Sequence, residues 1–224
     1  MNNNNGFTLI ELLVTLAVSG ILMAGVYTTF QSQQNSYLAQ DQVSEMQQNI
    51  RAGLHFLISD LRMSGFDGGF DITHSSCNVP AAISPVAPGL LATTAAQLDF
   101  SKDLNFDGDC ADAGENLSYY VYVASDGVSK LGRRDNNNLP VQALAENIQG
   151  IEFRYLDNNG AVTATLANIR SVQISILARA GNTDRNFTDT NVYTTASGTV
   201  WGPFNDNIRR RFQIVDVQLR NAGI

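Results

Sequence analysis

The sequence predicts an α+β fold, in which one long N-terminal helix precedes a head built on an antiparallel β-sheet. Two observations support this prediction: residues 8–64 contain no proline and have helical patterning, and strand patterns begin only after Gly65. The chain has 224 residues, of which 44% are hydrophobic, so it can bury one substantial core but is short for two full domains. We therefore expect one helix packed on one sheet.

The helix predicted over residues 8–64 has two halves of different character. Residues 7–30 are mostly apolar and carry a single charge, Glu11, and at about 1.5 Å per residue they are long enough to cross a bilayer. Residues 31–64 form an amphipathic half, and Gly65 lies at its expected stop. Apolar residues recur in this half at spacings of three and four, at Met46, Ile50, Leu54, Leu57 and Leu61. Such a stripe needs a sheet to cover it.

The head is expected over residues 65–224. Five segments alternate in polarity or are rich in β-branched and aromatic residues: 95–103, 116–125, 148–157, 169–180 and 211–221. The sequence "DNNG" at 157–160 predicts a tight turn, and a short helical stretch is expected around 143–147. Residues 184–204 are polar, and we expect a surface excursion or, alternatively, a contact surface for a partner subunit, with Tyr193, Trp201 and Phe204 as anchors.

Charge and motifs exclude several classes of function. The formal net charge of −7 argues against a nucleic-acid-binding protein, which needs a basic surface to meet phosphates. The three arginines at 209–211 are the only basic run and are expected to be a solvated strand edge. The sequence has no phosphate-binding glycine loop, HExxH motif or G-x-S-x-G motif, and its two histidines, His55 and His74, suggest no shared site. We therefore expect no catalytic residues and no enzymatic activity.

The two cysteines, Cys77 and Cys110, predict a disulfide. They are an even number in a chain that begins like an exported protein, which favours a bridge over two buried thiols. The bridge would close a loop of about 30 residues. In the chain-entropy account, such a loop stabilises the fold by roughly 3–4 kcal/mol.

The segment "DLNFDGDCADAGE" at 103–115 has the pattern of a calcium-binding loop. Oxygen-bearing side chains at alternate positions, followed by a glycine, match the first half of such a loop, because they converge on one hard cation. Gly114 stands where the pattern requires an acid, so another acidic residue would have to replace it. The candidate ligands for Ca²⁺ are Asp103, Asn105, Asp107, Asp109, Asp112 and Glu115. The alternative is a solvated acidic turn without metal; we expect no other cofactor.

Glu11 distinguishes among three interpretations of the apolar segment: a cleaved secretory signal, a plain membrane anchor, or an anchor that is processed before the apolar run. A carboxylate within hydrocarbon costs about 3 kcal/mol unless it is paired or protonated. A plain anchor has no reason to carry such a group, and the segment lacks the basic start of a secretory signal. The third interpretation gives Glu11 a role if the segment later packs beside a positive charge.

The stretch "GFTLIELLVTLAVSGIL" resembles the class III signal of type IV prepilins and type II secretion pseudopilins. The resemblance implies that residues 1–6 are a leader, that a prepilin peptidase cuts between Gly6 and Phe7, and that Phe7 is then N-methylated. It also implies that Glu11 is the assembly glutamate, which pairs with the α-ammonium of a neighbouring subunit. The leader "MNNNNG" lacks the usual basic residues, and the apolar half lacks the proline usual in major pilins.

Later segments narrow the resemblance to PilW-type minor pilins. These are the helix end at 48–66, the strand patterns at 147–160 and 169–180, and the ending "RRRFQIVDVQLRN" at 209–221. A pilin-like fold is thus implied, with a transmembrane half-helix and an extracytoplasmic head. The two alternatives are a J-type minor pseudopilin of a type II secretion system, and a calcium-dependent adhesive head on a pilin stem.

The resemblance also implies a place and partners. The protein would take part in priming pilus assembly and in the tip complex. Before assembly it would span the inner membrane once, in contact with lipid, with its head in the periplasm; afterwards it would lie in the cell-surface pilus. Its implied partners are other minor pilins, the major pilin, the prepilin peptidase and the inner-membrane assembly platform.

Overall fold

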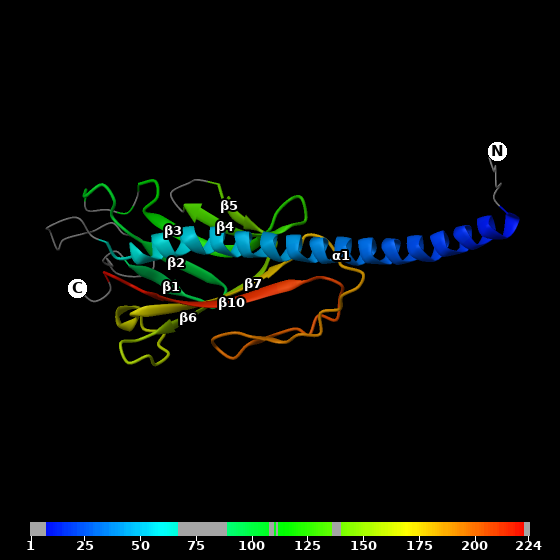
Figure 1. The fold of residues 1–224 in the computed structure, drawn as a ribbon. Coiled ribbons are helices and arrows are strands. Elements are labelled where there is room, and N and C mark those ends of the chain that lie inside the picture. The colour runs from blue at the N-terminus through cyan, green and yellow to red at the C-terminus, as the bar shows by residue number, and fades with distance from the viewer. Residues whose placement is uncertain (1–7, 67–88, 108–109, 111, 136–139, 222–224) are drawn as a thin grey trace. The chain divides into compact units, whose positions relative to one another are not determined.

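The computed structural model describes residues 8–66, 89–107, 110, 112–135 and 140–221, and it confirms the α+β class (Figure 1). In chain order the elements are α1 (Leu9–Arg62), β1 (Leu90–Thr93), β2 (Gln97–Ser101), β3 (Asn116–Val123), β4 (Ser129–Asp135), β5 (Gln142–Glu146), β6 (Ile148–Leu156), the 3-10 helix η1 (Leu166–Asn168), β7 (Ser171–Arg179), β8 (Tyr193–Thr194), β9 (Val200–Trp201) and β10 (Arg210–Gln218).

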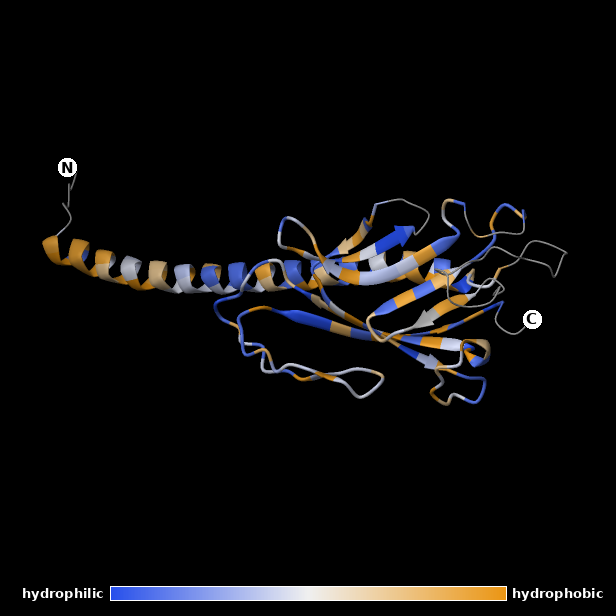
Figure 2. Ribbon diagram, turned by 180° about the vertical axis from the view of Figure 1, so that it is seen from behind, coloured by the Kyte–Doolittle hydropathy of each residue, from blue (hydrophilic) through white to orange (hydrophobic). Residues whose placement is uncertain are grey.

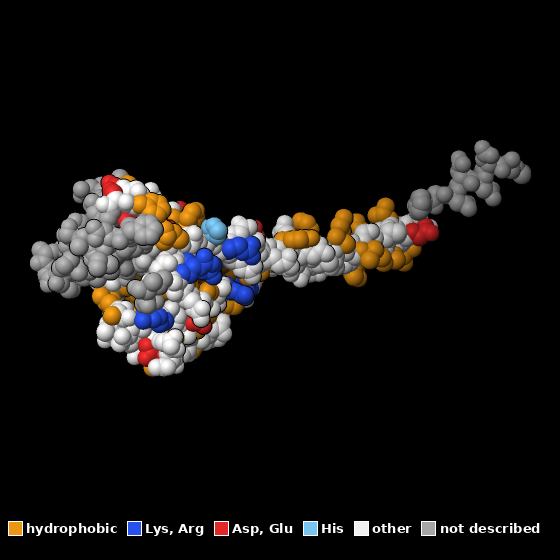
Figure 3. All heavy atoms as spheres, turned by 90° about the vertical axis from the view of Figure 1, so that its left-hand side faces the viewer, with side chains coloured by type: hydrophobic (Ala, Val, Ile, Leu, Met, Phe, Trp, Pro, Cys, Tyr) orange, Lys and Arg blue, Asp and Glu red, His pale blue; other side chains and the backbone are white. Residues whose placement is uncertain are grey.

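The chain divides by its contacts into two compact units, Met1–Gln42 and Val43–Ile224, and α1 runs through the boundary between them. In the first unit the large apolar side chains between Leu9 and Phe30 are all at least half exposed. Figures 2 and 3 show hydrophobic residues dominating this part of the helix and its surface. Within the described part of the chain, α1 is the one helix long and apolar enough to cross a membrane.

The second unit contains a five-stranded antiparallel sheet in the order β1-β2-β3-β4-β5. Each strand pairs antiparallel with its neighbour in sequence, so the sheet needs no crossover connection. At the turn between β3 and β4, Gly127 has φ +77° and its N–H bonds to Ala124 O at 2.9 Å. A glycine favours this left-handed conformation because it has no Cβ.

A second sheet has the order β10-β7-β6, with both strand pairs antiparallel. Asn147 alone links β5 of the first sheet to β6 of the second, at a φ of +58°. Asparagine tolerates this left-handed conformation better than most residues. The carbonyl of Asn147 also accepts the Arg179 N–H at 2.9 Å, which ties the change of sheet to the end of β7.

The C-terminal part of α1 packs on the head through the predicted stripe. All five residues of the stripe are buried: Met46, Ile50, Leu54, Leu57 and Leu61. Gly53 lies in the same face, where an added Cβ would be 2.8 Å from Leu131 Cδ2, so glycine permits close approach of the helix to β4. Gly65, at φ +74°, follows the end of the helix as predicted, and its N–H bonds to Ser101 O at 3.0 Å.

The five predicted strands are confirmed as β2, β3, β6, β7 and β10. The predicted turn "DNNG" is also confirmed: Asp157 N–H bonds to Ala161 O at 2.9 Å, and Gly160 has φ +77°. Beyond it, the returning chain forms a single bridge between Leu156 and Val162.

The helix expected around 143–147 is wrong, because Gln142–Glu146 is strand β5. Its alanine, leucine and glutamate favour a helix by local propensity. The strand forms instead because it pairs with β4 and buries Ala145 beside Gly53 of α1. Packing against the sheet and the helix therefore overrides local preference.

The segment expected to be a surface excursion folds back over the second sheet. It carries the short hairpin β8–β9, and the Trp201 ring lies 6.0 Å from the Phe212 ring, nearly perpendicular to it. An added Cβ at Gly150 would lie 3.4 Å from Trp201, so this indole rests on β6. Tyr193 and Phe204 also contact each other. The three aromatic residues considered as anchors for a partner are therefore partly used by the head itself.

Candidate functional site

The helix α1 starts with a reciprocal pair of side chains, Thr8 and Glu11. The Thr8 N–H and the Thr8 hydroxyl both donate to Glu11 Oε2, each at 2.9 Å, and the Glu11 N–H donates to Thr8 Oγ1 at 3.4 Å. This is a capping box, in which two side chains satisfy N–H groups that lack partners at a helix start. The sequence signal "TLIE" at 8–11 could have revealed the role of Thr8.

The capping box fixes the Glu11 carboxylate at the N-terminal end of α1. A helix N-terminus carries partial positive charge, so it favours a carboxylate. Both bonds from Thr8 go to Oε2. The predicted processing residues Gly6 and Phe7 lie outside the described residues. The structure therefore identifies Thr8 as the local hydrogen-bond partner of Glu11 at the start of an apolar helix.

The acidic loop at 103–115 is held by its own side chains. Asn105 Nδ2 donates to Asp107 Oδ2 at 2.8 Å and to Asp112 Oδ2 at 2.6 Å, so it bridges the two carboxylates. Asp103 Oδ1 accepts the Phe106 N–H at 2.8 Å, and Glu115 Oε1 accepts the Leu104 N–H at 2.8 Å. Both Asp103 and Glu115 are buried.

Five of the six predicted calcium ligands thus lie in one described loop; Asp109 lies outside the described residues. Within that described part, no three His, Cys, Asp or Glu side chains are arranged to hold a metal ion. Their oxygens fit a hard cation chemically, but Asn105 would have to turn its oxygen toward the centre. Calcium binding stays a prediction. Cys110 is buried in the same loop, and its predicted partner Cys77 lies outside the described residues, so the disulfide also stays a prediction.

Two family comparisons match the chain. The prokaryotic N-terminal methylation motif matches residues 1–27, and the type IV pilus-assembly protein W family, PilW, matches residues 118–221. The first match covers the apolar start with Glu11, and the second runs from β3 to the end of β10. Together the two matches support a PilW-like type IV minor pilin.

Among solved structures, this PilW-like pilin is similar to a type IV-like pilin from Thermus thermophilus, at 12% sequence identity and a TM-score of 0.46. The alignment covers 79% of this chain and 98% of that chain. No curated protein matches the chain at a significant level.

In the pilin head, Asp60 of α1 connects the helix to β3, to β4 and to Lys102, which directly follows β2. Its Oδ1 accepts Lys102 Nζ at 3.0 Å, and its Oδ2 accepts the Tyr119 hydroxyl at 2.6 Å and Arg133 Nε at 2.8 Å. Burial raises the pKa of Asp60, but the hydrogen bonds from Tyr119, Arg133 and Lys102 outweigh it and hold that pKa below its usual value. The carboxylate is therefore ionised at neutral pH.

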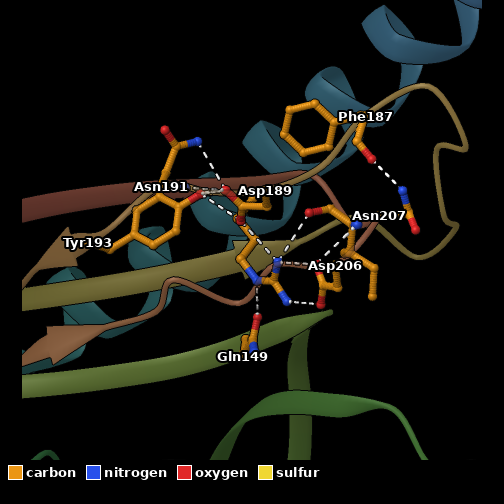
Figure 4. Close-up of polar contacts among 9 residues, drawn as sticks. Gln149, Phe187, Asp189, Asn191, Tyr193, Asp206 and Asn207 are labelled. Atoms are coloured by element: carbon orange, nitrogen blue, oxygen red, sulfur yellow. Dashed lines mark hydrogen bonds and ion pairs between the residues drawn. The ribbon is translucent and has the colours of Figure 1, made fainter.

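A second charged cluster binds the predicted surface excursion, residues 184–204, to the second sheet (Figure 4). The Arg210 side chain is 2% exposed and binds Asp206 through both terminal nitrogens, each at 2.7 Å. It also binds Asp189 Oδ2 at 3.0 Å and Gln149 Oε1 at 2.7 Å. Asp189 in turn accepts the Tyr193 hydroxyl, at 3.0 Å to Oδ2. Arg210 therefore joins β6, β10 and the excursion.

The expectation of a solvated arginine run at 209–211 is therefore wrong for Arg210, whose side chain is buried. Arg210 is buried in the cluster, and Arg209 binds Asp184 Oδ2 at 2.8 Å while its guanidinium lies 4.2 Å from the centre of the Phe187 ring. Only Arg211 is exposed. Sequence offers no signal for these pairs, because the carboxylates lie between four and about 25 residues away along an irregular segment.

Proposed function

We propose that this minor pilin enters a filament through the N-terminal half of α1 after cleavage between Gly6 and Phe7 and N-methylation of Phe7. In this proposal the α-ammonium of one subunit pairs with the Glu11 carboxylate of its neighbour. Both ions are costly alone in hydrocarbon, and together they offset most of that cost. The observation that carries the proposal is the Thr8–Glu11 pair at the head of an unpartnered apolar helix.

The exposed apolar surface supports assembly through this helix. Residues such as Leu9, Ile21 and Met23 are more than two thirds exposed in the isolated chain. In a membrane this surface contacts lipid, and in a filament it contacts neighbouring helices, so assembly exchanges one apolar contact for another. Because hydrophobic burial changes little in that exchange, the register between helices must be set by specific polar contacts. Glu11 is the one charged side chain from Leu9 to Phe30.

We further propose that the subunit primes assembly and remains in a tip complex with other minor pilins and the major pilin. The protein would wait in the inner membrane beside the assembly platform, with its head in the periplasm, and would then reach the cell surface. The match to the PilW family supports this role. The protein would act as a structural subunit and as a substrate of the prepilin peptidase.

The test replaces Glu11 by Gln, which keeps the size and removes the charge. The matched control is Asp41→Asn, which removes an exposed carboxylate from the same helix. Intact mass and N-terminal sequencing of membrane protein report cleavage and methylation, and the subunit content of sheared filaments reports incorporation. We expect normal processing of both variants. Incorporation of Glu11→Gln should fall at least about tenfold, the factor that corresponds to about 1.4 kcal/mol.

Two results would contradict the proposal. Normal incorporation of Glu11→Gln would remove the charge-pairing account while leaving the pilin assignment intact. A wild-type chain still beginning at Met1 in cells with an active prepilin peptidase would remove the processing step. Recovery of the subunit with a secretion apparatus, and its absence from sheared pili, would favour the J-type pseudopilin.

A further inference from the structure

Glu152 of β6 carries a buried carboxylate oxygen without a hydrogen-bond donor. The residue is 7% exposed and lies opposite Ser175 in the β6–β7 register, and Ser175 Oγ accepts the Ala196 N–H from the turn between β8 and β9. Its Oε1 is fully buried and has no hydrogen-bond partner among the described residues. A buried ionised group normally has a partner, so an oxygen in this state calls for a ligand that the chain itself does not supply.

Hydroxyl oxygens gather around this carboxylate. They come from the turn that joins β8 to β9, at Thr195, Ser197 and Thr199. Burial raises the pKa of Glu152, but these hydroxyls outweigh it and lower the pKa, so the carboxylate is ionised at neutral pH. The nearby cation Arg154 bonds elsewhere, through Nη1 to Gln173 Oε1 at 3.1 Å and to Ala196 O at 2.6 Å.

A count of protons shows why the hydroxyls alone do not satisfy Glu152. Thr195 Oγ1 and Ser197 Oγ lie 3.1 Å apart, and Ser197 Oγ and Thr199 Oγ1 lie 2.9 Å apart, so two of the three hydroxyl protons serve these two bonds. One hydroxyl proton and the Ser197 N–H remain for a carboxylate that can accept about four bonds. Each hydroxyl oxygen keeps a lone pair, which can be offered to a cation.

We propose that Glu152 and the hydroxyls of Thr195, Ser197 and Thr199 bind a monovalent cation of the sodium or potassium type. The donors are all hard oxygens, which suit cations of this kind rather than metals that prefer nitrogen or sulfur. The Arg154 guanidinium already lies beside this turn, so a monovalent ion adds less uncompensated positive charge here than a divalent ion would. The ion would fasten the hairpin turn to β6, beside the bond from Ala196 N–H to Ser175 Oγ at 3.0 Å.

The fluorescence of a tryptophan in the chain can report cation binding at this site. Trp201 is the single tryptophan of the sequence and lies in β9, at the end of the same hairpin. Its ring packs over Gly150, two positions before Glu152 on β6, and against Phe212 of β10. A cation that tightens the hairpin onto the sheet should therefore change the fluorescence of this indole.

The experiment uses the full chain in detergent micelles and titrates NaCl, and separately KCl, while choline chloride keeps the ionic strength constant. Trp201 fluorescence and the melting temperature are recorded. We expect a saturable fluorescence change and a rise in melting temperature with at least one of the two salts. Glu152→Gln should abolish both responses. The control Glu146→Gln removes an exposed carboxylate bonded to Lys130 and should keep both.

A second variant separates loss of the ligand from loss of the fold. Thr195→Val keeps the shape and the Glu152 charge but removes one oxygen donor, so the half-saturating concentration should rise several-fold. In choline chloride alone, Glu152→Gln should still unfold in one cooperative transition, because glutamine keeps the size of the side chain and its amide can bond the same hydroxyl groups. Equal responses in sodium, potassium and choline salts would overturn the proposal. So would an unchanged response in Glu152→Gln, or a response to calcium chloride alone.

Discussion

Residues 9–42 and 43–62 belong to one continuous helix, yet they bury their apolar side chains in different ways. Leu16 is 68% exposed in the first part, whereas Leu57 is fully buried in the second. The residue type and the helical backbone are the same in both parts. The difference in exposure therefore arises from what surrounds each part. The second part is covered within the chain by the two sheets, while the large apolar side chains between Leu9 and Phe30 stay exposed.

Polar groups follow the same division. In the first part, Glu11 finds its partner three residues away, in Thr8. In the second part, the partners of Asp60 lie more than 40 residues away, on β3, on β4 and directly after β2. The start of the helix is therefore organised locally and leaves its sides open to other molecules. The end of the helix is fixed into one head.

The largest expected effect compares the same substitution in the two parts. Leu57→Ala should lower the free energy of unfolding of the head by about 3 kcal/mol, because it removes buried methyl groups and leaves a cavity. Leu16→Ala, in the exposed part, should leave that free energy unchanged. Urea unfolding of the full chain in micelles, followed by Trp201 fluorescence, measures both. Equal destabilisation by the two variants would contradict the division of the helix.

Asp60→Asn should have the next largest effect, about 2 kcal/mol, because it leaves Lys102 and Arg133 without their carboxylate partner. The folded-state pKa of Asp60 lies below its usual value of 3.8, so its stabilising effect is present above about pH 4 and is lost as the pH falls through the folded-state pKa. The wild type and Asp60→Asn should therefore differ at pH 7 and converge in acid. Curves that stay parallel down to low pH would show that the pair does not act through ionisation.

A smaller effect is expected from glycine to alanine changes in the two parts. At Gly53 an added Cβ would lie 2.8 Å from Leu131 Cδ2, so the leucine must move, and we expect a loss of about 1–2 kcal/mol. At Gly25 nothing lies within 4 Å of an added Cβ, so Gly25→Ala should leave head unfolding unchanged. The same urea titration compares them. A stabilised Gly53→Ala would mean that helix propensity outweighs close packing at this position.

The smallest effect concerns the acidic loop. If the loop binds calcium as predicted, millimolar Ca²⁺ should stabilise the head by about 1 kcal/mol or less, because Asn105 must first leave its two carboxylate partners. Melting curves with and without calcium test this, and Asp107→Asn should remove the shift. If the melting temperature of the wild type does not shift with calcium, the loop is a solvated acidic turn without metal.

Helices and strands could be predicted from sequence where the spacing of apolar residues is regular. They could not be predicted where pairing with another strand determines the structure. The stripe from Met46 to Leu61 and the five longest strand patterns follow directly from alternation and helical spacing. Strand β4, "SKLGRRD", was missed because four of its seven residues are charged, although the turn at Asp126 and Gly127 before it is a hairpin signal. Burial of its Leu131 depends on contact with α1 at Gly53, which lies far away in sequence.

The sequence by itself determined the apolar half of α1, the place of Glu11 in it, and the order of the main strands. These features depend on contacts within a few residues and on the spacing of side chains, which are written directly in the chain. Only the tertiary structure decided that β5 is a strand, that Arg210 is buried, and that Glu152 lies beneath a turn of hydroxyl groups. Each of these depends on which distant segments lie side by side, because burial and charge pairing are properties of neighbours in space.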